Sequence, residues 1–369
     1  MVPTSRARLR PPPFPACLAP TAVAATVALA ALTAACGGDD GGGDIDARTD
    51  ATVAVDAAVD GAATHPDLPE TLPSPLPSGP VALKVATFNA GLVQLVKAGP
   101  QRIAPIQAAL AGLDADVICL QELYTQYTDP AVFAEALAAT FPYAWYETSV
   151  VNPLGNGLAI LSKRPLYRGR HLRYVMNDSN NVVDRAVIAA TVVDAAGGYH
   201  AHVLCTHIQA GLDGAGVTRR QAQLAELGAF VTAQGYAGAP AILLGDFNAG
   251  PDPDPGDDEC SDDSNCAPTC LGADTASYAA MATTYGWDDP ASTLFSACTS
   301  CRDQFVQMAT LNLFPCEPSQ RIDHCFTRNL AGAAVTAITR ELDDPVSISG
   351  AGGTAMWLSD HYAVRCVID

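Results

Sequence analysis

Polar residues with catalytic chemistry stand at the ends of several apolar segments in this sequence. Asp246 and Asn248 come directly after the apolar run at 241–244, where turn preference alone would explain an Asp-x-Asn pair. Other strand-like segments begin or end in the same way, with Asn89, Glu122, His207, Asp323, Asp360 and His361. Carboxylates hold Mg²⁺, histidines transfer protons near neutral pH, and amides donate to developing negative charge. The set as a whole therefore indicates metal-assisted hydrolysis of a phosphoester.

The segments that carry these residues alternate between strand and helix patterns. Apolar or alternating runs predict strands at 81–89, 115–123, 157–162, 185–193, 199–208, 240–248, 321–326, 333–342 and 361–368. Helical spacing of apolar residues predicts helices at 102–113, 130–140 and 218–234. Strands mixed with helices over about 290 residues indicate an α/β domain with two packed sheets.

The charge of the chain limits the partners it can bind. Asp and Glu number 39 against 20 Lys and Arg, which gives a formal net charge of -19. This balance argues against tight, charge-driven binding to a nucleic-acid backbone. It does not exclude chemistry on a phosphate, because a bound cation reverses the local field.

The N-terminus is typical of an exported protein. Arg6, Arg8 and Arg10 precede an Ala-rich apolar run, so residues 1–35 are predicted to be an export signal peptide. The LTAAC stretch resembles a bacterial lipoprotein signal, which would leave Cys36 lipidated and hold the protein at a membrane. An ordinary cleaved signal, and a secreted protein, is the alternative. Residues 36–80 are rich in Gly, Asp and Pro and are predicted to form a flexible tether.

Export also sets the expectation for the cysteines, because paired cysteines outside the cytoplasm are usually disulfides. Cys119 and Cys205 lie within apolar strands and are expected to stay unpaired. Eight further cysteines fit four bridges of open connectivity: Cys260, Cys266, Cys270, Cys298, Cys301, Cys316, Cys325 and Cys366. Zinc at the C-x-x-C pair of Cys298 is the less favoured interpretation.

Residues 251–320 interrupt the alternation of strands and helices. They are predicted to be a Cys-rich insertion, stapled by disulfides, on the same rim as the Asp-x-Asn pair. Their acidic start at 251–263 offers closely spaced carboxylates for a structural Ca²⁺. The spacing and terminal glutamate of an EF-hand loop are missing, so a solvated acidic loop is favoured over a calcium site.

Seven motifs, in order along the chain, resemble the endonuclease/exonuclease/phosphatase superfamily. They are TFNAGL, DVICLQEL, AILSKRPL, VLCTHIQAG, LLGDFNAGP, RIDHCF and LSDHYAV. That superfamily includes deoxyribonuclease I, apurinic endonucleases, sphingomyelinases and inositol phosphatases. The resemblance covers residues 81–369 apart from the insertion. It implies a catalytic domain with a four-layer α/β sandwich, in which two mixed β-sheets lie face to face between helices and the site lies at one edge.

The resemblance also implies which residues bind metal and phosphate. Glu122 would be the principal ligand of Mg²⁺, or of another divalent cation such as Mn²⁺ or Ca²⁺. Asn89 would lie on the metal or the phosphate, and Asp360 close to the metal or the water. Asn248 would hold a phosphoryl oxygen. Arg185 stands where relatives place a cationic phosphate contact, although a surface arginine is an equal alternative.

The same resemblance assigns the groups that move protons. Asp246 would orient or deprotonate the attacking water, and Asp323 would fix the tautomer of His361. Members of the superfamily differ over which group is the general base, so Asp246 and His361 remain alternatives. His207 would stabilise the transition state or protonate the leaving oxygen. The remaining strand histidines are expected to be structural: His200, His202 and His324.

Three features favour a phospholipid head group as the substrate. THIQAG resembles a Thr-His-Leu-Gln-Ala stretch of sphingomyelinases, the helix that follows carries the Arg-x-x-Gln of that branch, and a lipid anchor would hold the enzyme beside membranes. The sequence therefore predicts an exported phosphodiesterase of the phospholipase C or sphingomyelinase type. An extracellular nuclease of the deoxyribonuclease I type, with nucleic acid as substrate, is the first alternative. A non-catalytic surface binding lipoprotein is the second, although the catalytic polar groups are all present.

Overall fold

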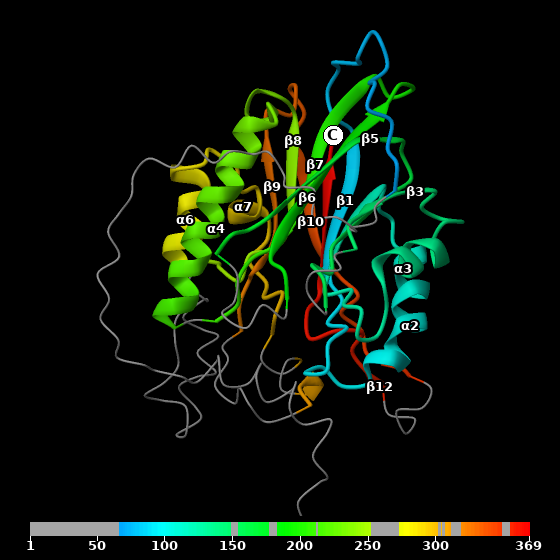
Figure 1. The fold of residues 1–369 in the computed structure, drawn as a ribbon, viewed down its shortest axis with the longest axis vertical. Helices are drawn as coiled ribbons and strands as arrows, with labels where there is room; N and C mark the ends of the chain where they lie inside the picture. Colours follow the sequence, from blue (N-terminus) through cyan, green and yellow to red (C-terminus); the bar gives the residue numbers. More distant parts are fainter. Residues whose placement is uncertain are drawn as a thin grey trace, which may run out of the picture. The chain divides into compact units, whose positions relative to one another are not determined.

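Two mixed β-sheets lie face to face at the centre of the structure, a computed structural model (Figure 1). One sheet has six strands, in the order β10 (Val335–Glu341), β13 (Ala363–Ile368), β1 (Leu83–Asn89), β2 (Val117–Gln121), β4 (Ala159–Ser162) and β3 (Tyr143–Tyr146). The other has five, in the order β5 (Leu166–Arg173), β6 (Ala186–Asp194), β7 (Tyr199–His207), β8 (Ala241–Asp246) and β9 (Asp323–Arg328). A separate two-stranded antiparallel sheet consists of β11 (Val346–Ser347) and β12 (Ala355–Met356).

The structure describes most of one unit of the chain, Asp44–Asp369. The described residues are 66–148, 154–176, 183–211, 213–251, 273–301, 304, 307–310, 319–348 and 355–369. The predicted signal peptide at 1–35, the lipidation candidate Cys36 and all but the first residue of the acidic calcium candidate at 251–263 lie outside them. So do the cysteines Cys260, Cys266, Cys270 and Cys316. No helix of the described residues is long and apolar enough to cross a membrane.

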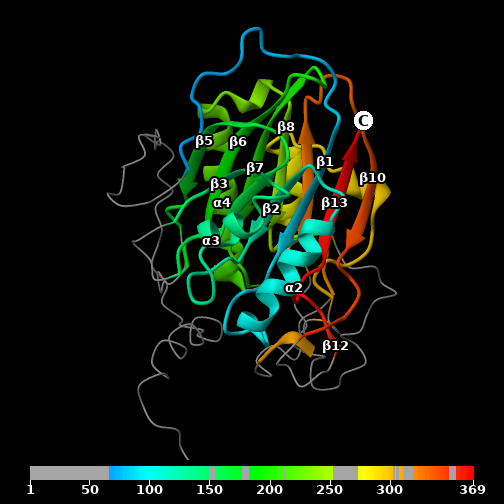
Figure 2. The same cartoon turned by 90° about the vertical axis from the view of Figure 1, so that its right-hand side faces the viewer.

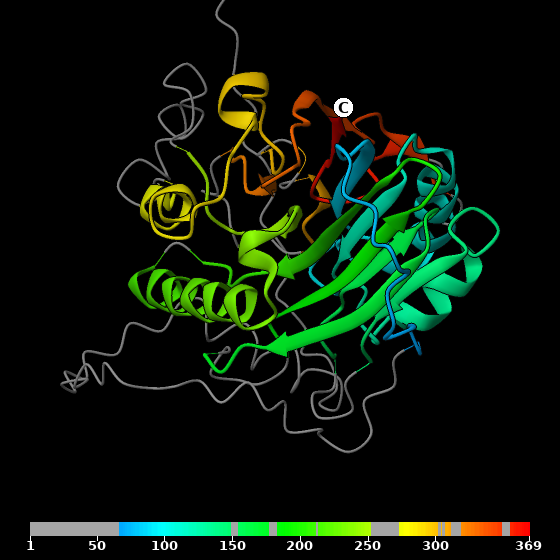
Figure 3. The same ribbon diagram turned by 90° about the horizontal axis from the view of Figure 1, so that it is seen from above.

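Helices cover the outer face of each sheet, as Figures 2 and 3 show. The six-stranded sheet is covered by α2 (Gly99–Gly112) and α3 (Pro130–Ala136). The five-stranded sheet is covered by α4 (Gly214–Ala233) and α6 (Thr275–Thr283), with the 3₁₀ turn η1 (Tyr236–Gly238) and the short α7 (Ala291–Leu294) nearby. Aspartates at the N-caps of α3, α4 and α6 accept backbone N–H bonds and so fix where these helices begin.

Alternation along the strands builds three apolar layers from this arrangement. Val85 of β1 points between the sheets, whereas Phe88 of the same strand points out toward Ile106 of α2. Leu244 of β8 likewise points inward, and Leu243 packs against α4 and α6. The predicted four-layer α/β sandwich is therefore confirmed.

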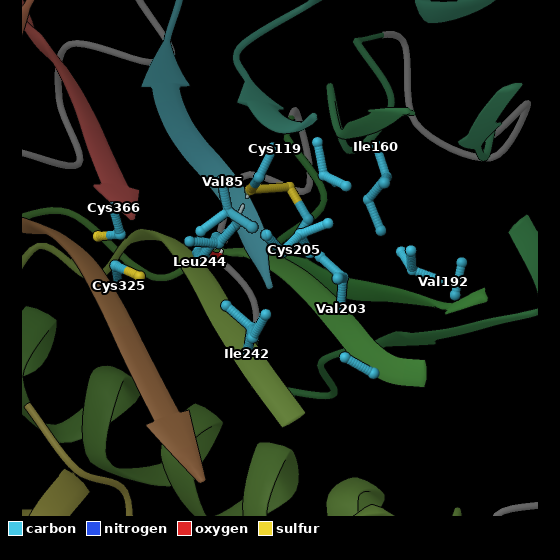
Figure 4. Close-up of a cluster of buried hydrophobic side chains, with 14 of the residues drawn as sticks. Val85, Cys119, Ile160, Val192, Val203, Cys205, Ile242, Leu244, Cys325 and Cys366 are labelled. Carbon is cyan, nitrogen blue, oxygen red and sulfur yellow. Dashed lines mark hydrogen bonds between the residues drawn. A yellow bond between two sulfur atoms is a disulfide. The ribbon is translucent and has the colours of Figure 1, made fainter. Parts of the chain in front are cut away.

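The cysteines correct two predictions. Cys119 of β2 and Cys205 of β7 form a disulfide that joins the two sheets, although they were expected to stay unpaired (Figure 4). Both side chains point between the sheets, and their sequence separation of 86 residues hides this proximity. The prediction of four disulfides among the other eight cysteines is also wrong, since Cys325 and Cys366 are free thiols buried in the same interface. Cys298 and Cys301 do form a disulfide.

The segment predicted as a tether contacts the folded domain over its described part. Leu68 packs against the core between the sheets, and the Glu70 carboxylate accepts two hydrogen bonds from Arg170 of β5, at 2.7 and 2.8 Å. Gly79 donates its N–H to Gly198 at 2.8 Å. The chain from residue 66 onward is thus bound along the domain rather than separate from it.

The described part of the predicted insertion contributes to the outer layers. Met281 of α6 and the neighbouring Trp287 are buried with Leu227 and Phe230 of α4. The helix α6 therefore helps to cover the five-stranded sheet.

Candidate active site

The site begins as a row of side chains across the end of the five-stranded sheet. His207 of β7 pairs in register with Asp246 of β8, and Asp246 pairs with Asp323 of β9. The Nε2 atom of His207 lies 3.4 Å from Oδ2 of Asp246. Gly245 has φ 153°, and a Cβ there would meet the carbonyl oxygen of Thr206 at 2.1 Å. Glycine is therefore required for this close approach of the two parallel strands.

The Asp-x-Asn pair after β8 is a closed turn. The Asp246 carboxylate accepts the N–H of Asn248 at 2.9 Å, and Asn248 has a left-handed φ of 48°. The Asn248 amide donates to the carbonyl of Ile208 at 3.0 Å. Phe247, between them, is buried against Phe326. Turn chemistry therefore orients Asp246 and ties its loop to the residue that follows His207.

The end of the six-stranded sheet supplies amide and carboxylate groups. Asn89 of β1 donates from Nδ2 to Oδ2 of Asp246 at 3.0 Å and accepts the N–H of Gly91. Glu122, directly after β2, has a left-handed φ of 59°, and its side chain is only 16% exposed. Such backbone strain in a non-glycine residue is concentrated at functional sites. The Ser359 hydroxyl lies between the carbonyl oxygen of Asn89, at 2.7 Å, and the Asp360 carboxylate, at 3.1 Å.

A histidine–carboxylate pair bridges the two sheets. Nδ1 of His361, in the loop before β13, lies 2.8 Å from Oδ2 of Asp323 on β9. Nε2 of His361 lies 3.9 Å from Oδ2 of Asp246. Burial alone would lower the pKa of His361, but the charge and hydrogen bond of Asp323 raise this pKa well above its ordinary value. The imidazole is therefore held as an imidazolium at neutral pH.

The second histidine of the site has the opposite character. His207 is 2% exposed, and Nη1 of Arg185 contacts its Nε2 atom. Burial and the positive charge of Arg185 lower the pKa of His207 well below its ordinary value. Arg185 is itself largely buried, so it is part of the site rather than a surface arginine.

The carboxylates of the site are strongly desolvated. Burial, followed by the charge of Asp360, raises the pKa of Glu122 to about 7. Burial, followed by the charge of Asp323, raises the pKa of Asp246 to about 6. A divalent cation would relieve both effects, because it replaces water as the partner of these oxygens.

Two neighbouring places offer ligand atoms for such a cation. Atoms of Asp246, Asp323 and His361 lie within 4.8 Å of one another. Asp323 and His361 already bind each other, whereas Glu122 and Asp360 repel each other without a cation between them. The donor set fits a hard divalent ion better beside Glu122 and Asp360.

The structure thus brings every predicted site residue to one edge of the sandwich. The histidines expected to be structural lie elsewhere: His202 stacks on Tyr236, the His200 ring contacts the carbonyl of Pro77, and His324 bonds to the carbonyl of Ala249. His324 follows Asp323 on β9 and feels its charge, but its own hydrogen bond goes to the backbone of Ala249.

Sequence reasoning missed one arginine that holds the site together. Arg102 of α2 is fully buried and donates to the carbonyls of Ala90, Gly91 and Leu358. It therefore ties the loop after Asn89 to the loop that leads to Asp360. Burial lowers its pKa to about 10, which still leaves it charged at neutral pH. The sequence feature that could have revealed it is its spacing: Arg102 lies four residues before Ile106 and eight before Leu110, on the apolar face of the helix.

The Arg-x-x-Gln of α4 proves to be part of the framework behind His207. Arg220 donates to the carbonyls of Gln209 and Gly211, each at 2.8 Å, and to Asp274 at the same distance. The Gln223 side chain accepts the N–H of Gln209 at 2.8 Å. The helix thus fixes the loop that follows His207.

The fold and the site together define a hydrolase of phosphoester bonds. Residues 86–361 match the model of the Endonuclease/Exonuclease/phosphatase family, and the chain belongs to this family. No curated protein sequence gives a match to it.

Solved structures of known proteins share the fold. Sphingomyelinase C from Streptomyces griseocarneus is 20% identical, with a TM-score of 0.53 over 78% of this chain and 99% of that one. A mutant beta toxin from Staphylococcus aureus with bound magnesium ions is 17% identical, with a TM-score of 0.56 over the same shares. D. rerio TDP2, complexed with a single-strand DNA product, is 15% identical, with a TM-score of 0.55 over 78% of this chain and 98% of that one.

Proposed function

We propose that this protein is an exported, metal-dependent phosphodiesterase that uses an activated water to cleave the head group of a phospholipid of the sphingomyelin type. The observation that carries the proposal is the desolvated cluster of Asp246, Asp323 and His361, which faces His207, Glu122 and Arg185. Export rests on the sequence of residues 1–35, and attachment to a membrane rests on lipidation of Cys36.

The opposite electrostatics of the two histidines support a division of roles. His361 is protonated at neutral pH and donates toward developing negative charge, whereas a pKa of about 6 leaves Asp246 deprotonated above that pH. Asp246 is therefore the better general base for the attacking water. His207 and Arg185 face the phosphoryl oxygens and the leaving oxygen from the other side.

A bound Mg²⁺, or another divalent cation, would polarise the phosphoryl oxygen and neutralise its charge in the transition state. Glu122 and Asp360 would hold the ion, and Asn89 orients Asp246 by donating to its carboxylate. The beta toxin structure with magnesium supports this choice of cation.

Two observations favour a sphingomyelin-type lipid. The THIQAG loop is fixed by Arg220 and Gln223 from the helix that also marks the sphingomyelinase branch. A sphingomyelinase C and a beta toxin are among the structures that share the fold. The DNA complex of TDP2 favours a nuclease as the second candidate.

One panel of assays distinguishes these candidates. The purified protein is offered sphingomyelin, phosphatidylcholine, plasmid DNA and a generic phosphodiester, each with Mg²⁺ and with a chelator. We expect the fastest hydrolysis with sphingomyelin and none after chelation. Faster cleavage of DNA would establish the nuclease instead. Activity that survives exhaustive chelation would contradict the metal role of Glu122, and no turnover of any substrate would favour a binding protein.

A further inference from the structure

The Cys298–Cys301 disulfide closes a short ring beside the active site. Between the two cysteines lie Thr299 and Ser300, both buried. Their backbone pairs with Gln320: the N–H groups of Thr299 and Ser300 donate to its carbonyl at 2.8 and 3.0 Å, and its own N–H donates to Ser300 at 2.8 Å. The ring is thus docked on the segment that leads into β9.

Thr299 contacts both segments that carry the His361–Asp323 pair. Its hydroxyl accepts the N–H groups of Ile322 and Asp323, each at 3.0 Å. Its carbonyl accepts the N–H of Tyr362, the residue after His361, at 2.8 Å. One residue inside the disulfide ring therefore sets the distance between the two backbones from which the pair is built.

The disulfide is also accessible to a reductant. Cys298 is partly exposed, whereas Cys119 and Cys205 are completely buried. The Arg340 guanidinium lies over the Tyr362 ring, and its Nη1 atom is 3.9 Å from the Cys298 sulfur and 3.7 Å from the Cys301 sulfur. A cation beside a sulfur stabilises the thiolate that leaves when a disulfide is opened.

We propose that the Cys298–Cys301 disulfide is a redox switch that acts on the active site through Thr299, the positioning residue of the His361–Asp323 pair. The proposal rests on the proposed function for its activity readout. When the disulfide is formed, the ring restricts the backbone of Thr299 and keeps His361 and Asp323 in register. When the disulfide is reduced, Thr299 is released, and turnover falls while substrate binding is retained.

The reductant is a dithiol, which supplies both electrons and both protons. A thiolate of the dithiol attacks the sulfur of Cys298, the more exposed of the two cysteines, the S–S bond breaks, and Cys301 leaves as a thiolate beside Arg340. The second thiol of the reductant then displaces Cys298. The reductant ends as a cyclic disulfide, and both cysteines end as thiols with the two protons that the reductant gave up.

The test compares the full chain before and after treatment with dithiothreitol. Native alkylation and mass spectrometry identify the cysteines that have opened. In protein whose Cys298 and Cys301 have become alkylatable, we expect kcat to fall at least fivefold and KM to change less than twofold. Activity should return on oxidation with glutathione disulfide. Unchanged kcat in protein with this bond open would overturn the proposal.

Variants separate this switch from other effects of the reductant. Cys298→Ala/Cys301→Ala should have the low kcat of the reduced protein and no further response to the dithiol. Thr299→Val should have a similarly low kcat. Thr299→Ser keeps the hydroxyl and should retain at least half of the wild-type kcat. Thr293→Val, at an exposed position, is the matched control. An equal response to the dithiol in the double cysteine variant places the effect elsewhere and refutes the switch.

A readout without substrate keeps this proposal distinct from the proposed function. The proton on Nδ1 of His361, bonded to Asp323, should give a downfield proton NMR resonance that is absent in His361→Ala. We expect this resonance to broaden or shift upfield on reduction and in Thr299→Val. If it does so in a protein that turns over no substrate, the switch stands and the proposed function fails. If it is unaffected while the wild type turns over substrate, the switch fails alone.

Discussion

The two sheets contribute different chemistry to the same edge of the sandwich. The six-stranded sheet and its loops present Asn89, Glu122 and Asp360, an amide and two carboxylates suited to a hard cation, together with His361. The five-stranded sheet presents His207, Asp246 and Asp323 in a cross-strand row suited to moving protons. In each sheet a central parallel pair of strands, β1–β2 or β7–β8, ends at this edge and places its polar residues side by side.

Neither edge is complete without the other. Asn89 binds Asp246, His361 binds Asp323, and His207 lies 3.9 Å from Glu122, so each of these contacts crosses between the sheets. The site is therefore a product of sheet packing, and changes that affect one sheet should alter the chemistry of the other.

Removing one histidine from each edge should have the largest effect. We expect His207→Ala and His361→Ala each to lower kcat by at least about a hundredfold, the size of a general acid–base contribution. His200→Ala is the control, because this residue lies on β7 at the end away from Asp246. Steady-state kinetics on the best substrate of the panel measure the effect. Near-normal activity in both site variants would exclude this mechanism.

Breaking the covalent link between the sheets should come next. We expect Cys119→Ala/Cys205→Ala to lower the free energy of unfolding by about 2–4 kcal/mol, the usual effect of losing a native disulfide. Cys325→Ala is matched to it, since it removes a buried sulfur from the same interface without breaking a disulfide. Urea denaturation followed by circular dichroism measures both. Equal losses in the two proteins would show that the bond itself contributes nothing.

The repulsion at the six-stranded edge should appear as a pH-dependent stability. The pKa of Glu122 is raised from 4.5 to about 7 in the folded protein. The stability that its proton contributes is therefore complete below pH 4.5 and is lost as the pH rises through 7, a change worth about 3 kcal/mol.

Glu122→Gln keeps a neutral side chain at every pH. Without divalent ions, we expect its unfolding temperature to rise relative to wild type by about 5 °C between pH 5 and pH 8.5. Differential scanning calorimetry of both proteins, with chelator, measures this difference. A difference that does not change with pH would show that Glu122 is not desolvated.

The smallest effect is expected from neutralising the partner of His361. Asp323→Asn removes a negative charge that raises the pKa of both His361 and Asp246. Both pKa values should fall, so both limbs of the profile of kcat/KM against pH should move to lower pH, with about a tenfold loss at pH 8. Limbs that stay in place would show that neither group controls the profile.

Much of this edge was predictable because strand ends are local features. Apolar runs that end in Asn89, His207 or Asp246 give both the strand and the position of the polar group. Motif resemblance then added the order of the layers. The strands β3 and β5 were missed because their half-exposed residues carry no clear alternation. Arg102 was missed because a charged residue on an apolar helix face looks like an interruption of the pattern.

The sequence by itself determined the family, the alternation of strands and helices, and the identity of the polar groups, since these depend on residue types and local spacing. Only the tertiary structure decided which groups face each other. It joined Cys119 to Cys205, set opposite pKa shifts on His207 and His361, and placed Thr299 between the two segments of the His361–Asp323 pair. Burial and charge at a site depend on packing between sheets, and residues far apart in the chain create that packing.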